Sequence, residues 1–213
     1  MGLTFLPEAG PRTLAALLGA IGVAQLRAGP PSDAPPEDLW LGDPAVVRAC
    51  AALLEGLVRD PEFLRRCAKA DLPPDDERAI AVADVFEARI DAARTLAEAV
   101  AHQSGLGGRA AQAHRDLFAR AALASLPPGL ALWDLDPWSS SFAAVRGRML
   151  AARIRVFLRD RYDEDWWRNP RSLQSLNGLW GRGGRPSFAE LWSEMGGEPE
   201  LTPLVQEWTE ACR

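Results

Sequence analysis

The sequence predicts an all-α fold, a single domain of about eight or nine helices. Strand signals are nearly absent, since the 213 residues include one tyrosine and no run of alternating β-branched residues. Helix starts are well marked, because Asp43-Pro44 and Asp60-Pro61 each place an N-cap residue before a proline at the first helical position. Ser187 and Glu190 have the spacing of a capping box, which predicts a further helix start.

Local signals define the elements of the N-terminal half. Pro11 can open the first helix, whose apolar residues recur on one face, and a Pro-rich linker covers 29–41. Glycines within 105–108 end the longest predicted helix. The helices predicted here cover 12–26, 45–58, 62–70, 76–102 and 109–125.

The C-terminal half is divided by breakers in the same way. Pro127-Pro128-Gly129 interrupts the chain, 130–141 is expected to be irregular, and 165–170 forms a Trp-rich corner. The helices predicted here cover 141–162, 171–180, 187–195 and 204–212. Within the expected single domain, the segments are 1–28, 29–41, 42–126 and 127–213.

Charge and hydropathy exclude several classes of partner. The net charge of −5 and the pI of about 5.2 argue against binding to nucleic acid or to an anionic membrane. The arginines of 146–168 lie beside Trp166 and Trp167, but neighbouring acidic residues offset them, so intramolecular salt bridges are the better interpretation. The apolar stretch 14–26 is too short to span a bilayer and follows no basic segment. We expect a cytoplasmic protein without a signal peptide.

The remaining reactive residue types favour structural roles. The three cysteines are widely spaced, without a Cys-x-x-Cys pair, so they are expected to be buried, reduced thiols. His102 and His114 have no further ligands at useful spacing and are expected at helix ends or on the surface. Serines 139–141 lack a Gly-x-Ser-x-Gly elbow and are expected to cap the following helix.

One N-terminal segment has the outline of a metal site without its ligands. Residues 5–11 read Phe-Leu-Pro-Glu-Ala-Gly-Pro. With histidine in place of both prolines, it would read His-Glu-Ala-Gly-His, which places two imidazoles on one zinc ion and a glutamate as general base. Pro7 and Pro11 have no side-chain donor atom, and Pro11 also lacks the N–H that would bond to residue 7.

Three later segments strengthen this comparison. Residues 42–55 read Gly-Asp-Pro-Ala-Val-Val-Arg-Ala-Cys-Ala-Ala-Leu-Leu-Glu, and 134–137 read Asp-Leu-Asp-Pro. Residues 158–170 read Leu-Arg-Asp-Arg-Tyr-Asp-Glu-Asp-Trp-Trp-Arg-Asn-Pro, the most specific block. Over most of its length the chain resembles the C-terminal helical catalytic lobe of bacterial His-Glu-x-x-His zinc metallopeptidases related to the thimet oligopeptidase type.

The resemblance implies that the chemical positions have been replaced. The third zinc ligand of the family, a glutamate, falls on Arg48, and the tyrosines that contact substrate fall on Ser140 and Ala144. Only Glu8 stands at the general-base position. Because arginine stays cationic and proline has no donor, the resemblance predicts no metal site and no cofactor.

The sequence therefore favours a catalytically inactive metallopeptidase homologue that binds a peptide, a small ligand or a partner protein. The candidate ligand-binding residues are Glu8, Arg48, Ser140 and Arg146. Arg48 is expected to take the electrostatic place of the metal ion and to pair with Glu8, because an unpaired buried carboxylate costs several kcal/mol.

Two other interpretations stay open. The chain is a metal-free enzyme that uses Glu8 as acid or base and Arg48 as an anion clamp, or it is a truncated, decayed peptidase fragment. A peptide or protein partner is expected in the leading interpretation, and an exposed apolar face would favour a homodimer.

Overall fold

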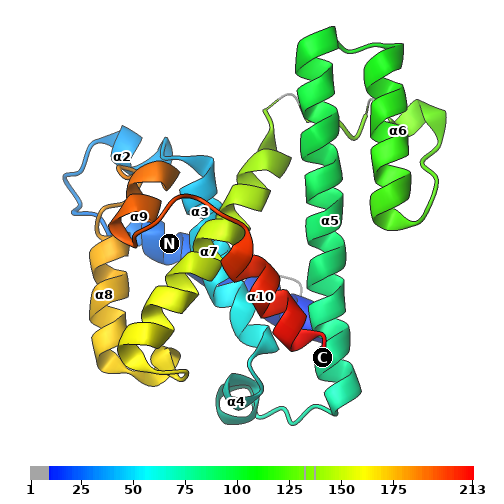
Figure 1. The fold of residues 1–213 in the computed structure, drawn as a ribbon. Helices are drawn as coiled ribbons and strands as arrows, with labels where there is room; N and C mark the ends of the chain where they lie inside the picture. The colour runs from blue at the N-terminus through cyan, green and yellow to red at the C-terminus, as the bar shows by residue number, and fades with distance from the viewer. Residues whose placement is uncertain (1–9, 132, 137) are drawn as a thin grey trace. The chain divides into compact units, whose positions relative to one another are not determined.

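The computed structural model describes residues 10–131, 133–136 and 138–213, and the regular secondary structure of this part of the chain is all helical, with no strand. The all-α prediction is confirmed: the described residues form ten α-helices, and Figure 1 shows how they follow one another along the chain. Their bounds are α1 Pro11–Ala28, α2 Pro36–Trp40, α3 Pro44–Glu55, α4 Pro61–Phe63, α5 Pro74–Ser104, α6 Gly108–Ala122, α7 Ser140–Tyr162, α8 Pro170–Trp180, α9 Phe188–Glu194 and α10 Thr202–Ala211.

The predicted caps start the helices as expected. The Asp43 side chain accepts a hydrogen bond from the Ala45 amide at the start of α3. Asp60 accepts from the Glu62 and Phe63 amides at the start of α4. Ser187 and Glu190 form the reciprocal capping box of α9. These short-range hydrogen bonds satisfy backbone donors that the first helical turn leaves open.

The main difference from the prediction lies in the Pro-rich linker. Within 29–41 the structure contains the short helix α2, which has a proline at its first position and two acidic residues in its first turn. Both features favour a helix start. The described chain thus has one helix more than the nine expected ranges.

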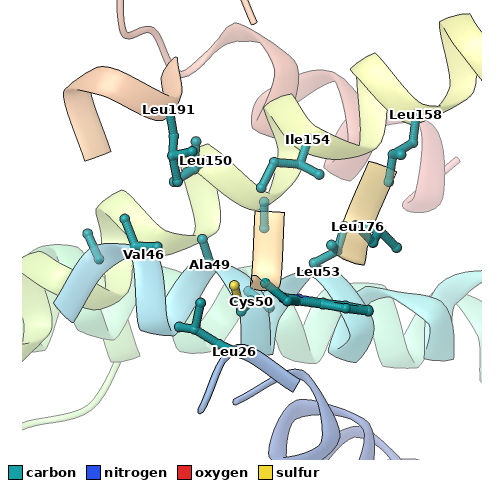
Figure 2. Packing of buried hydrophobic residues seen from close by; sticks show 14 of the residues in the cluster. Leu26, Val46, Ala49, Cys50, Leu53, Leu150, Ile154, Leu158, Leu176 and Leu191 are labelled. Atoms are coloured by element: carbon teal, nitrogen blue, oxygen red, sulfur yellow. The ribbon is translucent and has the colours of Figure 1, made fainter. Parts of the chain in front are cut away.

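The contacts between residues divide the chain into two compact units. The expectation of a single domain stays a prediction. The first unit comprises Met1–Ala81 and Arg146–Arg213, and the second comprises Val82–Val145. In the first, one buried apolar cluster joins α1, α3, α7, α8 and α9, and Figure 2 shows their side chains meeting there. Leu26, Leu53, Leu150 and Leu158 are among its fully buried members.

Glycines let the helices of the first unit approach closely. A Cβ on Gly22 of α1 would overlap the carbonyl oxygen of Cys50 in α3. A Cβ on Gly147 of α7 would lie 2.6 Å from the Cβ of Arg48. The backbones can therefore pack at these two crossings only without a side chain.

The second unit contains most of α5, α6, the loop that follows and the first turn of α7. Its apolar cluster is small and centres on Ala97, Ala110 and Leu135. His114 is 1% exposed and its Nε2 lies 2.9 Å from Asp134 Oδ2, so the expectation of a surface or helix-end histidine was wrong. Arg94 of α5 donates two hydrogen bonds to the same carboxylate, at 2.9 and 2.7 Å, which fixes the loop to both helices.

The predictions for the cysteines were partly confirmed, and the prediction for His102 was confirmed. Cys50 is buried, but Cys67 is exposed and Cys212 is half-buried, so the prediction of three buried thiols holds for Cys50 alone. His102 is exposed near the C-terminal end of α5, as predicted. Among the helices that the structure describes, none combines the length and apolar character needed to cross a membrane.

Candidate functional site

The N-terminal part of the predicted site lies outside the described residues. This applies to Pro7 and to Glu8, so the expected pair between Glu8 and Arg48 stays a prediction. Pro11 occupies the first position of α1, where its missing N–H leaves no helical hydrogen bond unmade.

Arg48 lies on α3 and has an acidic partner two turns further along the same helix. Its Nη1 lies 2.8 Å from Oε1 of Glu55, and the two side chains are 34% and 22% exposed. The stem of Arg48 lies at the point where Gly147 of α7 approaches α3. Glu55 was not among the predicted site residues, although its spacing of seven residues from Arg48 places both on one helix face.

Arg146 and Ser140 occupy different settings on α7. The Arg146 guanidinium carbon lies 4.1 Å from the centre of the Phe188 ring, a cation–π contact within the first unit. Ser140 is exposed in the second unit, and its amide donates to Asp136 Oδ2 at 3.1 Å. Hydrogen bonds from the Ser140 side chain and the Trp138 amide lower the pKa of Asp136. Ser140 therefore begins α7, and its amide is bound to the turn that precedes the helix.

The described residues at the family's ligand positions do not fit the zinc ion that the active peptidases of that type hold. Pro11 and Arg48 offer no lone pair to a metal, and Arg48 is held in an ion pair. Elsewhere in the described ranges, no three His, Cys, Asp or Glu side chains converge as metal ligands.

The first unit contains a cleft of about 610 Å³ whose walls are strongly charged. Residues from the end of α3 through α4, the start of α5, the middle of α7 and α10 line it. Eight carboxylate side chains and five arginines contribute, among which Asp75 and Glu210 are exposed on the rim. The lining charge is thus mixed, with an excess of acidic groups.

The floor of this cleft is a buried ion pair. Arg155 of α7 donates from Nε and Nη2 to the two carboxylate oxygens of Glu207 in α10, at 2.8 and 2.7 Å. Its Nη1 donates to the Ala52 carbonyl oxygen at 2.9 Å, so the guanidinium also joins α3. Arg155 is 5% exposed and Glu207 is 9% exposed. The bidentate geometry fixes the direction of both side chains.

Two further arginines surround the same carboxylate. Arg59 Nη2 lies 3.7 Å from Glu207 Oε2, and Arg159 Nη1 lies 3.9 Å from Glu207 Oε1. Burial alone would raise the pKa of Glu207, but attraction to Arg155, Arg59 and Arg159 outweighs it and lowers the pKa. The cleft thus has a buried, paired carboxylate and guanidinium at its base and exposed groups of both signs on its walls, which complements a ligand with charges of both signs.

Comparisons with protein-family models, with curated proteins and with solved structures found no match to this chain.

Proposed function

We propose that this chain is a catalytically inactive homologue of the His-Glu-x-x-His peptidases that binds a peptide without hydrolysing it. The observation that supports this most directly is the ion pair between Arg48 and Glu55. In the resemblance, Arg48 stands where the third metal ligand belongs, and its guanidinium is neutralised by a neighbour on its own helix.

The charged cleft supports a peptide as the ligand. A peptide presents cationic and anionic side chains together with backbone hydrogen-bonding groups, and the cleft walls contain both signs of charge. Because eight carboxylates face five arginines, a peptide with a basic excess fits better than an acidic one.

The structure does not favour the alternative in which Arg48 clamps an anionic substrate in a metal-free enzyme. Such a clamp needs a guanidinium directed at the substrate, whereas Arg48 Nη1 donates to Glu55. A substrate carboxylate or phosphate would have to displace that partner.

The first experiment separates binding from hydrolysis. The untagged protein is produced in cells grown with added zinc, and its metal content is measured after purification. It is then incubated with a mixture of quenched fluorescent peptides. We expect substoichiometric zinc and no increase in fluorescence. Stoichiometric zinc together with peptide cleavage would overturn the proposal.

The second experiment measures binding by fluorescence anisotropy with fluorescein-labelled lysine-rich, serine-rich and glutamate-rich peptides. We expect the lysine-rich peptide to bind most tightly. The rim variant Asp75→Asn/Glu210→Gln should weaken its binding about tenfold, roughly 1.4 kcal/mol. The control Glu37→Gln removes an exposed carboxylate outside the cleft and should leave the affinity unchanged. Equal affinity for the three peptides, or no binding at all, would contradict the proposal.

A further inference from the structure

The second unit contains a separate small cavity of about 120 Å³. Glu98 and His102, one helical turn apart on α5, line it together with Asp136 from the loop between α6 and α7. Ala101, Leu106 and Leu135 form its apolar walls. The cavity thus combines acidic groups with an aliphatic lining in a space about four times the ~30 Å³ that one water molecule takes in the liquid.

Glu98 is the unusual member of this set. It is 2% exposed, and both carboxylate oxygens are shielded from solvent. The Ser141 hydroxyl and the Asp136 amide approach closely enough to lower the pKa of Glu98, yet neither completes a hydrogen bond of good geometry. Burial outweighs them and raises the pKa. A carboxylate in such a setting is costly to ionise unless a cation joins it.

Among the charged groups around Glu98, His102 attracts the carboxylate and so lowers its pKa, but this attraction is smaller than the effect of burial. Arg94, one turn earlier on α5, donates both of its hydrogen bonds to Asp134. His102 is exposed and its Nε2 lies 3.3 Å from the Ser139 hydroxyl oxygen. Asp136 adds a further negative charge, which itself raises the pKa of Glu98. The local balance therefore favours a positively charged occupant.

We infer that this cavity of the second unit receives a lysine side chain from a peptide or protein ligand. The inference rests on the proposed peptide-binding function and names the residue type that is recognised. The alkyl stem of the lysine would pack on Ala101, Leu106 and Leu135, and its ammonium group would face Glu98 and Asp136. A compact ammonium on a flexible four-carbon stem matches a small cavity with apolar walls and acidic groups.

Exposed apolar side chains of the same unit supply a surface for the rest of the ligand. Leu106 lines the cavity and is 69% exposed. Trp138, whose amide donates to Asp136 Oδ1, is 89% exposed, and Trp133 of the same loop is similarly exposed. Exposed tryptophans are enriched among binding hot spots.

The cavity is tested with n-butylammonium, which reproduces the lysine side chain, and with 1-butanol as its uncharged analogue. Binding is followed on the whole chain by NMR chemical shifts. We expect saturable binding of n-butylammonium to the wild type and to the control Glu87→Gln, which changes an exposed carboxylate on the same helix. Glu98→Gln should weaken binding at least tenfold. Equal binding to Glu98→Gln, or equally tight binding of 1-butanol, would overturn the inference.

A second variant tests the cavity without touching the carboxylate. Ala101→Leu fills the space that the alkyl stem would occupy with a larger side chain, so it should abolish n-butylammonium binding while the far-ultraviolet circular dichroism stays helical. Undiminished binding to a folded Ala101→Leu protein would also overturn the inference. Calorimetry in buffers of different ionisation enthalpy should show proton release on binding, since the ammonium favours ionised Glu98.

The outcomes also separate this inference from the proposed function. If lysine-rich peptide binds wild type and Glu98→Gln equally, the lysine pocket is wrong and the peptide-binding function stands. If n-butylammonium binds in a Glu98-dependent way but no peptide binds, the ammonium site stands and the peptide-binding function is wrong.

Discussion

At the scale of single residues, three glutamates show three degrees of charge compensation. Glu207 has a bidentate partner and two further arginines within 4 Å. Glu55 has one arginine at 2.8 Å. Glu98 is buried with no completed hydrogen bond to its oxygens. A glutamate therefore takes a different role in each setting, depending on its neighbours. Glu207 stabilises the first unit, Glu55 neutralises the charge of Arg48, and Glu98 lines the proposed pocket.

Removing the compensated charge at Glu207 should strongly destabilise the protein. Glu207→Gln leaves the buried Arg155 guanidinium without a carboxylate, so we expect the free energy of unfolding to fall by about 3 kcal/mol or more. The exposed pair of Arg182 with Glu194 provides the control, and Glu194→Gln should cost less than about 1 kcal/mol. Urea unfolding measures both. Equal effects of the two substitutions would contradict a stabilising role for the buried pair.

Glu98 and Glu207 should shift stability with pH in opposite directions. The folded-state pKa of Glu98 is raised, so its contribution is fully present at low pH and is lost as the pH rises through that value. The folded-state pKa of Glu207 is lowered, so its contribution is present at neutral pH and is lost on acidification. Relative to wild type, Glu98→Gln should therefore gain stability between pH 4 and pH 8, which thermal melts over this range can check. A pH-independent difference would contradict the raised pKa.

At the scale of helices, the sequence predicts where a helix begins better than it predicts which distant side chains pair. A cap such as Asp60 acts on amides two and three residues away, so its effect is visible in the local pattern. Arg155 and Glu207 pair although they are 52 positions apart, and no periodic pattern in the sequence predicts this contact. The helix α2 was missed because its prolines indicate a linker as readily as a helix start. The resemblance pointed to Arg48, but not to the partner that neutralises it.

The crossing of α1 and α3 should depend on Gly22. Gly22→Ala would drive a methyl group into the Cys50 carbonyl, which is backbone and cannot rotate away, so we expect a loss of about 2 kcal/mol or more. Gly178 in α8 is the matched control, because nothing lies within 4 Å of the position that an added methyl group would take there. Gly178→Ala should stabilise the protein by about 0.5–1 kcal/mol through helix propensity. Thermal unfolding of the two variants should move in opposite directions.

At the scale of the whole molecule, the two units differ in how much apolar core each contains. The described cluster of the first unit has 19 buried members, whereas that of the second has 3 and is supplemented by the Arg94, Asp134 and His114 contacts. Fewer buried contacts predict easier local opening. Hydrogen exchange on the full chain should therefore show amides of α6 exchanging at least tenfold faster than those of α3. Equal protection of the two helices would show that the units open together.

The buried thiol of Cys50 can be used to measure how often the core of the first unit opens, even in a cell lysate. Burial raises the pKa of Cys50 to about 12, against a weaker opposing effect of the neighbouring Trp180, so almost no reactive thiolate forms while the first core is closed. Cys67 is exposed on the same chain. An alkylating reagent should therefore mark Cys67 promptly and reach Cys50 only in molecules whose core has opened. The ratio of the two labels would report the lifetime of the folded state inside a lysate, without purification.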